Sequence, residues 1–546
     1  MISNVGTTHR VLGISLLATM VMISAASSCA APDAVPGPKK VVPPPEPDAG
    51  DEQDAGMDAE PVEPPAGDPA WATGYGEMTN DQKFFDVAFD SKANTLATTL
   101  GFINYITIPG LNNDAPYASG AIGSNPPITV QNVLVFKQDA LTHMPLWAVP
   151  IRAGNEIVRS IVDVDADGNV IVAGGFAGKL EIQLKDGSPG SSSPSFGSYD
   201  AFIAKFNAAG DEVWLKTFGA ATEDYITDVG VDGSGNIVVV GYSNSASVDF
   251  GDGKQVQTLS GKDLFVAKYD SLGTVLWAKR VGEGAATDIT GKNNWREPTG
   301  TLDVAEDGSI VIGGTYRGTL SFPPEGISAV AAEDGFVAKL AADGSGQWGF
   351  GFGSANCKQR VRSVAIGPKG EVALTGSFQG SVTIGDQTMS SFKGSPDLLV
   401  AMLEPDGKPR WVKHYGSLGD QLGSKVLIDE TGRVFVGGSF TGTIDFFDSG
   451  TLTNTTKEMP FTPTDIFVAK FKDDGTPLWA HAWGDADPNV LVGIQTIEGG
   501  VLWKNDKAEP FVVFGGINSG SMDFNGKVQT VKATGYEDAY MMSITY

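Results

Sequence analysis

The sequence predicts an all-β fold, a seven-bladed β-propeller, from three features that recur along the chain. The segment Asp263–Val281 has an apolar alternating run, a tight turn at Asp270–Gly273 and a second apolar run, a pattern typical of a β-hairpin. A second hairpin, whose clearest copy is Asp228–Tyr242, recurs seven times. A tryptophan in the last strand also recurs seven times, with copies 63 to 76 residues apart, at Trp71, Trp147, Trp214, Trp277, Trp348, Trp411 and Trp479. Four strands per repeat predict blades that bury their faces against one another.

The order of strands within a repeat predicts how the ring closes. The aspartate-turn hairpin supplies the two inner strands, a Val-Ala-Lys strand comes third, and the tryptophan strand is outermost. The chain begins this pattern on a tryptophan strand, Trp71–Tyr75, and ends on a third strand, Ala539–Tyr546. We expect these two strands to complete one blade, which leaves no open sheet edge. The predicted propeller therefore spans residues 71–546.

Residues 1–28 are predicted to be a lipoprotein signal peptide. Arg10 precedes an apolar stretch, Val11–Ala26, that is shorter than a typical membrane span. The following Ala26-Ser27-Ser28-Cys29 resembles a bacterial lipobox, with Ala26 where that class usually has leucine. The resemblance implies lipid attachment at Cys29 and a bacterial cell-envelope location, at the outer membrane or the cell surface. The alternative is an ordinary secretory signal that ends near an unrelated cysteine.

Residues 29–70 are predicted to be a disordered linker. Between Ala30 and Ala70 the chain is rich in proline and has ten acidic residues against Lys39 and Lys40. Such a segment buries too little apolar surface to offset the entropy of ordering it. Proline keeps it extended, so its expected role is to hold the propeller away from a membrane.

The charge of the chain excludes nucleic acid as a partner. The formal net charge is −27, with 65 acidic and 38 basic residues. A protein that binds nucleic acid neutralises phosphates with lysine and arginine, whereas this chain repels them. Cations and basic partners fit the charge better.

The repeated segments resemble a known family. The units that include Asp228–Val240, Asp263–Lys268 and Trp277–Gly282 are similar to the bacterial seven-bladed β-propeller repeat called SBBP. The resemblance implies a secreted or surface-exposed protein and no particular chemistry. The turns also resemble the tryptophan-docking repeats of quinoprotein propellers, in which the spacing from aspartate to glycine is one residue longer.

Binding is expected on the face of the propeller that has the long loops. The turns within the hairpins are tight and share one face, whereas the connections between second and third strands and between blades are longer. The least repeat-like loop, Gly284–Gly300, holds the candidate partner-binding residues Asn293, Asn294, Trp295 and Arg296. The alternative for Trp295 is packing at the edge of the core. A piece shared by several loops, such as Gly442–Phe446, is predicted to be a structural strand extension.

One group of residues suggests a metal. Asp163, Asp165 and Asp167 alternate before Gly168, and three such carboxylates suit one Ca²⁺ ion. The alternative is an ordinary polar hairpin turn, because the glutamate that completes a calcium-binding EF-hand loop is absent. No other cofactor is implied.

Motifs for catalysis are scarce. The chain has four histidines and no zinc-protease, serine-hydrolase or phosphate-loop motif. The leading hypothesis is therefore a non-enzymatic binding or scaffold module for a protein or glycan. The alternatives are a hydrolase or lyase with a site in the central channel, and an assembly or scaffold factor for outer-membrane proteins. Carboxylates or histidines that converge in the channel favour an enzyme, and an apolar patch on the long-loop face favours a protein partner.

Overall fold

A computed structural model describes residues 67–76, 81–119, 130–251, 253–257, 263–284, 300–321, 326–330, 333–355, 357–446, 449–454, 464–485, 494–504, 510–524, 530–533 and 537–545. These residues form antiparallel strands and two single-turn 3₁₀ helices, η1 (Asn112–Asp114) and η3 (Phe392–Gly394). Within these ranges, none of the helices has the length and hydropathy to cross a membrane.

The pairing of the described strands gives seven four-stranded groups, called blade 1 to blade 7 in chain order of their first strands. Blade 1 has β2 (Gln82–Asp90), β3 (Thr95–Phe102), β6 (Asn132–Asp139) and β7 (Pro145–Ala153); blade 2 has β8 (Glu156–Val164), β9 (Val170–Ala177), β12 (Asp200–Phe206) and β13 (Glu212–Phe218); blade 3 has β14 (Asp224–Val231), β15 (Ile237–Ser243), β18 (Asp263–Tyr269) and β19 (Val275–Gly284). Blade 4 has β20 (Gly300–Val304), β21 (Ile310–Leu320), β23 (Asp334–Leu340) and β24 (Gly346–Phe352); blade 5 has β25 (Gln359–Ile366), β26 (Val372–Phe378), β29 (Asp397–Leu403) and β30 (Pro409–Tyr415). Blade 6 has β31 (Gln421–Ile428), β32 (Val434–Phe440), β35 (Asp465–Phe471) and β36 (Pro477–Asp485); blade 7 has β37 (Gln495–Lys504), β38 (Pro510–Asn518), β41 (Asp538–Thr545) and β1 (Pro69–Tyr75).

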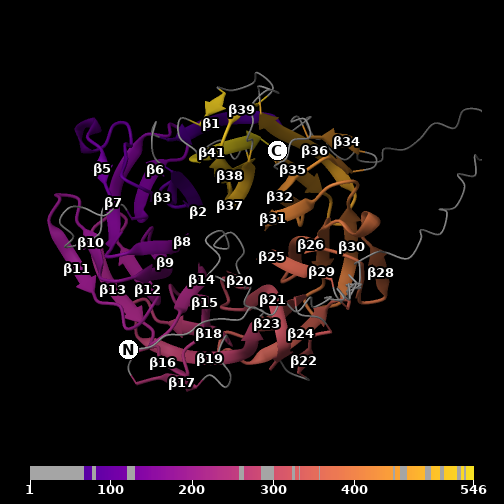
Figure 1. The fold of residues 1–546 in the computed structure, drawn as a ribbon, viewed down its shortest axis with the longest axis horizontal. Helices are drawn as coiled ribbons and strands as arrows, with labels where there is room; N and C mark the ends of the chain where they lie inside the picture. The colour runs from indigo at the N-terminus through magenta and orange to yellow at the C-terminus, as the bar shows by residue number, and fades with distance from the viewer. Residues whose placement is uncertain are drawn as a thin grey trace, which may run out of the picture.

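The predicted β-propeller is confirmed by the arrangement of these sheets. Figure 1 shows them side by side around a common centre, with the first strand of each blade innermost. Apolar clusters lie between neighbouring blades; for example, Trp147 of blade 1 packs in one cluster with Phe176 and Phe202 of blade 2. A small sheet cannot bury both faces alone, and stacking against two neighbours buries them.

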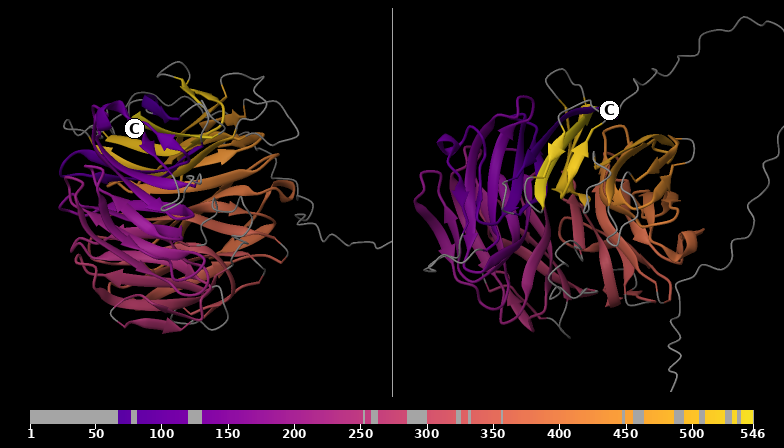
Figure 2. Two further views of the ribbon diagram at one scale, coloured as in Figure 1. Left: turned by 60° about the vertical axis from the view of Figure 1, so that its left-hand side comes forward. Right: turned by 45° about the horizontal axis from the view of Figure 1, so that its top comes forward.

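The first and the last described strands meet in blade 7. Strand β1 pairs antiparallel with β41, with Trp71 opposite Ser543 and Tyr75 opposite Ala539. Figures 1 and 2 show the indigo N-terminal strand beside the yellow C-terminal strands. The strand starts at Pro69, two residues before the predicted start, because the proline-rich composition before Trp71 hides the beginning of the repeat.

A repeated contact joins each outer strand to the next blade. The indole nitrogen of Trp147 donates a hydrogen bond to the Ala208 carbonyl at 3.1 Å, and the ring packs on Gly210, whose φ is +82°. A side chain at Gly210 would begin 2.5 Å from that ring, so the position requires glycine both for space and for backbone conformation. In blade 1 the equivalent turn residue is His143, also at positive φ, and its ring packs on Trp71 with centroids 4.1 Å apart.

The connections between second and third strands form short hairpins near the outer rim (Figure 1). They comprise β4 (Tyr105–Ile106) with β5 (Tyr117–Ala118), β10 (Leu180–Gln183) with β11 (Pro189–Ser193), β16 (Ser247–Asp249) with β17 (Gln255–Gln257), β22 (Ile327–Ser328) with the end of β21, β27 (Ser381–Ile384) with β28 (Gln387–Ser390), β33 (Thr443–Asp445) with β34 (Thr451–Thr453), and β39 (Ser521–Asp523) with β40 (Val531–Lys532). The shared loop piece is structural as predicted, since Val248, Phe250, Ile444 and Phe446 are all buried.

Candidate functional site

The central channel is the first candidate site, because carboxylates repeat on its innermost strands. An Asp-Val dipeptide occurs in the first strand of four consecutive blades, with its aspartate at Asp86, Asp163, Asp228 and Asp303. The first strand of a blade has a partner on one side only, so its other edge needs hydrogen bonds from elsewhere. These aspartates supply them.

Each of these carboxylates accepts a backbone N–H from the first strand of the next blade. The Val231 N–H donates to Asp163 at 2.8 Å and the Leu302 N–H donates to Asp228 at 2.9 Å. The corresponding bonds to Asp86 from Val162 and to Asp303 from Ile366 measure 3.3 and 2.6 Å. The row of carboxylates therefore joins the inner edges of neighbouring blades.

The electrostatics of the channel follow from placing several carboxylates near one lysine. Burial raises the pKa of Asp86 to about 6, although nearby Lys425 lowers it. Burial likewise raises the pKa of Asp163 to about 7, and Asp303 and Asp86 add to the rise. Burial lowers the pKa of Lys425, but the surrounding carboxylates outweigh that effect and raise it. Lys425 therefore stays charged while part of the carboxylate charge is held as protonated acid.

A small cavity opens among these residues. Its volume is about 30 Å³, and it is lined by Phe85, Asp86, Arg159, Ile161, Asp228, Gly300, Thr301, Arg362, Ser363, Ser424, Lys425 and Glu498. A space of this size holds one or two waters. Pockets that bind small molecules measure roughly 300–1,000 Å³. The cavity is lined mainly by polar and charged side chains.

We expect the channel to make stability depend on pH. In an unfolded chain Asp163 titrates near 3.8, whereas in the folded protein its pKa is about 7. Between these values the native state binds more protons, so its stability is full below pH 3.8 and is lost as the pH rises through 7. The loss is up to about 1.4 kcal/mol per pH unit for this group.

Denaturant unfolding at pH 5 and pH 8 tests this expectation. Asp163→Asn should show a smaller loss of stability between the two pH values than the unmodified protein. Asp167→Asn is the control, because Asp167 is solvent-exposed, and it should keep the original pH dependence. Equal slopes for all three proteins would contradict the expectation.

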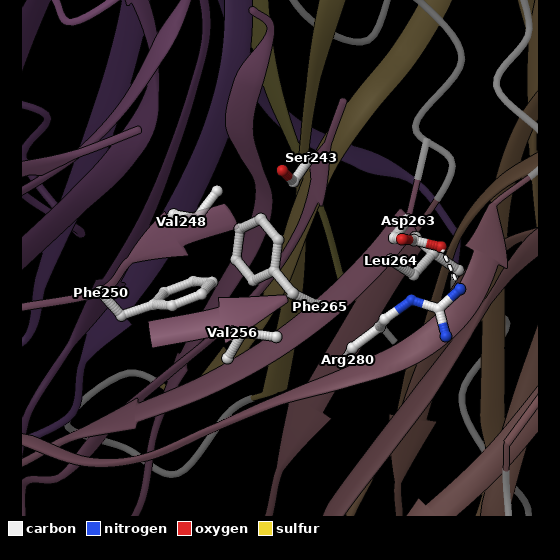
Figure 3. A pocket seen from close by; sticks show the side chains of 8 residues that line it. All are labelled: Ser243, Val248, Phe250, Val256, Asp263, Leu264, Phe265 and Arg280. Atoms are coloured by element: carbon white, nitrogen blue, oxygen red, sulfur yellow. Dashed lines mark hydrogen bonds and ion pairs between the residues drawn. The ribbon is translucent and has the colours of Figure 1, made fainter. Parts of the chain in front are cut away.

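A second crevice lies beneath the β16–β17 hairpin of blade 3. Figure 3 shows the apolar side chains of Val248, Phe250 and Phe265 on one side and the ion pair of Asp263 with Arg280 on the other. The guanidinium nitrogen of Arg280 lies 2.6 Å from the Asp263 carboxylate. The volume is about 10 Å³, so the crevice is a packing gap closed by an ion pair rather than a binding pocket.

The long-loop face carries exposed apolar side chains in fixed positions. In each of blades 2, 4 and 5, one exposed apolar residue precedes the third strand by four or five positions. The aspartate that begins the third strand accepts the backbone N–H of this apolar residue. The pairs are Phe196 with Asp200, Val330 with Asp334 and Phe392 with Asp397. The apolar side chains of Phe196, Val330 and Phe392 are 56%, 68% and 41% exposed. The three aspartates are buried. The loops of these three blades therefore each hold one apolar side chain in water at a defined place.

A further apolar side chain lies near one of these positions. Leu418, in the connection from blade 5 to blade 6, is 64% exposed. The Ser395 hydroxyl donates to the Phe392 carbonyl at 2.8 Å and also lies 3.2 Å from the Ser417 carbonyl, so it sits between the two loops. Phe392 and Leu418 therefore lie on linked loops.

The three predicted calcium ligands have three different partners. Asp163 accepts N–H groups of Val164 and Val231. Asp165 pairs with Lys205 at 2.9 Å, and Asp167 faces Lys92 at 3.4 Å. Burial alone would raise the pKa of Asp165, but the hydrogen bonds from Asn169 and Lys205 outweigh burial, and the net effect is a lowered pKa. The Lys205 ammonium group therefore already neutralises this carboxylate. Among the described residues no group of three metal-ligating side chains is placed to hold a metal ion, and the Ca²⁺ site stays a prediction.

The other predicted site residues cannot be compared with the structure. Asn293, Asn294, Trp295 and Arg296 lie outside the described residues, as does Cys29.

The second cysteine bears on the predicted lipid anchor. Cys357 is buried and disulfide-bonded. The sequence contains one other cysteine, Cys29. A sulfur atom that carries a lipid cannot also form a disulfide, so lipidation of Cys29 and a disulfide within one chain exclude each other.

Sequence reasoning missed two sets of residues that the fold uses. The Asp-Val dipeptide of the inner strands was a visible signal, but its aspartates resemble those of the turns. The lysine of the Val-Ala-Lys strand was also passed over, although it pairs with a turn aspartate in blades 1 to 3. Those pairs are Lys137 with Asp90, Lys205 with Asp165 and Lys268 with Asp232, at 2.7, 2.9 and 2.8 Å.

Comparison with known sequences gives a distant relative. No family model matches the sequence. An uncharacterized WD repeat-containing protein of Acanthamoeba polyphaga mimivirus is 23% identical over 486 residues, which cover 75% of this chain and 34% of the viral protein. The chain thus spans about a third of that relative's length.

Several solved structures are similar at low scores. The polysaccharide lyase Uly1 has 11% identity and a TM-score of 0.40, covering 88% of this chain and 99% of its own. The WD40 domain of Neurospora crassa Pan2 has 7% identity and a TM-score of 0.38, covering 86% and 95%. Sqt1 from Chaetomium thermophilum has 10% identity and a TM-score of 0.37, covering 82% and 96%. At such low identities and scores, neither activity nor partner is carried over from these proteins.

Proposed function

We propose that the chain is a non-enzymatic binding or scaffold module of the bacterial cell envelope, which binds a partner protein through its long-loop face. The observation that supports this most is the set of exposed apolar side chains at Phe196, Val330 and Phe392. Binding residues concentrate on loops that a rigid scaffold holds in place. The carboxylates of the channel, by contrast, already hold backbone N–H groups.

We further propose that the seven blades are the complete ring and that β1 closes it. The pairing of β1 with β41 supports this proposal, as does the cluster in which Tyr75 packs with Phe136 of blade 1 and Met541 of blade 7. Closure of this kind leaves no sheet edge between the first and last blades. The resemblance of the repeats to SBBP proteins is consistent with this count.

The location belongs to the same proposal. In molecules whose Cys29 sulfur is not used in a disulfide, a lipid on Cys29 would anchor the chain to a membrane of a bacterial envelope, and the linker of residues 29–70 would hold the propeller at a distance from it. Replacing Cys29 with serine is expected to move the protein from the membrane fraction to the soluble fraction. Cys357→Ser is the matched control and should stay in the membrane fraction. Membrane association that survives Cys29→Ser would rule out the anchor.

A cross-linking experiment on intact envelopes tests the long-loop face. Phe196→Asp and Phe392→Asp place charges in the proposed interface, and each should reduce the yield of the cross-linked partner at least several-fold. Leu272→Asp is the control, since Leu272 is 76% exposed but lies on the face with the tight turns. Equal yields from all variants would contradict the proposed face. Capture of a glycan rather than a protein would keep the face but change the ligand class.

An enzyme in the channel is the second candidate, because perturbed carboxylates often mark catalytic sites. The raised pKa values of Asp86 and Asp163 favour it. Their bonds to backbone N–H groups and the cavity of about 30 Å³ favour the binding module instead. A role in assembling outer-membrane proteins is a special case of the binding function, and the identity of the cross-linked protein distinguishes it.

A further inference from the structure

The fourth strand of each blade is the outer edge of its sheet. An edge strand presents unpaired N–H and C=O groups, and proteins protect such edges with lysine, proline or a covering strand. Six of the seven fourth strands have one of these protections within the described residues. Strand β24 of blade 4 has none, and its sequence Gly-Gln-Trp-Gly-Phe-Gly-Phe carries no charge.

The position two residues after the repeated tryptophan shows the difference most clearly. Strands β13, β19 and β30 have a lysine there, at Lys216, Lys279 and Lys413. Strand β24 has Phe350 in the same place. A lysine opposes strand addition because an added strand would crowd its charge, whereas Phe350 is uncharged and partly buried against the core between blades 4 and 5. Phe350 stacks on Trp348 with ring centroids 6.3 Å apart and an interplanar angle of 20°.

The other outer strands are protected in other ways. Strand β10 pairs with β7, the end of β21 pairs with β19, and β39 pairs with β36. Strands β30 and β1 begin with proline, at Pro409 and Pro69. Within the described part of the chain, β24 pairs with β23 alone. The unprotected edge is therefore a local property of blade 4 and not a feature of the repeat.

We propose that β24 accepts an extended segment of a partner polypeptide, which adds to blade 4 as a fifth strand. The backbone of β24 supplies hydrogen bonds that only another extended backbone matches along its length. The stacked rings of Trp348 and Phe350 favour apolar side chains on one face of the added segment. This interaction goes beyond binding at the long-loop face, because it uses the edge of a sheet and does not involve Phe196, Phe392 or Leu418.

The charge of the chain distinguishes between two possible sources of this segment. A second copy would bring another net charge of −27 to the interface. A partner segment flanked by lysine or arginine would instead be attracted to the acidic propeller. The added strand is therefore expected to come from a different polypeptide, apolar at alternate positions and basic at its ends.

A labelled synthetic peptide tests the proposal with the full chain. The probe is a fluorescent Lys-Val-Thr-Val-Thr-Val-Thr-Lys peptide, and its anisotropy is measured as the protein is added. Phe350→Lys copies the residue found in the equivalent strands and should weaken binding at least tenfold. Gln347→Lys places a charge on the same edge, outside the stacked pair, and should also weaken it. Val213→Lys in β13 is the matched control and should bind the peptide as the unmodified protein does.

Three further results are informative. A peptide with N-methylated backbone amides should not bind, since it cannot form the ladder of hydrogen bonds. Equal binding of the peptide by Phe350→Lys, Gln347→Lys and the unmodified protein would overturn the proposal, as would no binding at all. Dimers in sedimentation that Phe350→Lys dissociates would assign the edge to a second copy and overturn the choice of partner. Cross-linking at the long-loop face is measured separately, so either proposal can fail alone.

Discussion

Removing residues 67–76 is expected to open the propeller and to lower its melting temperature more than any single substitution discussed above. This segment contains β1, whose pairing with β41 joins the first and last parts of the chain. Without β1, strand β41 becomes the exposed edge of blade 7. The neighbouring blades then pack against a sheet of three strands instead of four. We expect a protein that unfolds earlier and aggregates.

The turn before β1 adds to this expectation. Gly67 lies four residues before Trp71, the same spacing that Gly273 has to Trp277. Its φ is +108°, and its N–H donates to the Thr545 carbonyl at 2.9 Å. A side chain at Gly67 would meet first His481 and then the ring of Trp479, both from blade 6, so the turn before β1 packs on the outer strand of blade 6.

A single substitution gives a graded version of the same test. Trp71 is partly buried in the cluster between blades 7 and 1, and Trp71→Ala should cost about 3 kcal/mol, at the low end of the range for tryptophan truncation. That is a large share of an ordinary stability of about 5–15 kcal/mol. Thermal unfolding measures both variants. Deletion of residues 41–54 in the linker is the control and should leave the melting temperature unchanged. An unchanged melting temperature after deletion of residues 67–76 would refute closure by β1.

The fold was predictable because its signal is repeated and local. The alternation of apolar residues, the turn glycine and the tryptophan recur with nearly constant spacing, so the loss of one copy does not hide the others. The start of the first repeat was placed too late for a physical reason. Gly67 and Pro69 do belong to a turn and a strand, but both residue types are also common in the linker before them.

The channel was not predictable, because it depends on which edge of a strand faces the centre. Asp163 and Asp165 look alike in sequence, two residues apart, yet Asp163 holds the next blade and Asp165 pairs with Lys205. Only the packing of neighbouring blades separates the two roles. The same holds for Phe196 and Phe392, which are single residues in variable loops and become a pattern only when the blades are superimposed.

Substitution of Lys137 by alanine is expected to cost about 3–5 kcal/mol, the range for breaking a buried ion pair by removing one partner. Its ammonium nitrogen lies 2.7 Å from the Asp90 carboxylate, and both side chains are 2% exposed. It also donates to the Gly168 carbonyl of blade 2 at 3.1 Å. The substitution therefore leaves a buried carboxylate without its cation and removes a bond between two blades.

We expect the loss of unfolding free energy in Lys137→Ala to be large because the ion pair is buried. An exposed ion pair of similar geometry tests whether burial is the cause. Lys408 lies 2.6 Å from Asp406, but these side chains are 81% and 55% exposed. Water screens such a pair, and Lys408→Ala should change the free energy of unfolding by less than about 1 kcal/mol. Denaturant unfolding at pH 7 measures both variants. Equal effects would mean that burial does not set the energy of these pairs.

The double variant Lys137→Met with Asp90→Asn separates the buried charge from the bond to the next blade. It removes both charges while keeping most of the side-chain volume and the amide that can accept the turn N–H groups of Lys92 and Ala93. If the uncompensated carboxylate causes the loss in Lys137→Ala, the double variant should recover most of the stability. If it recovers none, the bond to Gly168 is the dominant contribution, and the lysine of the Val-Ala-Lys strand serves chiefly to join neighbouring blades.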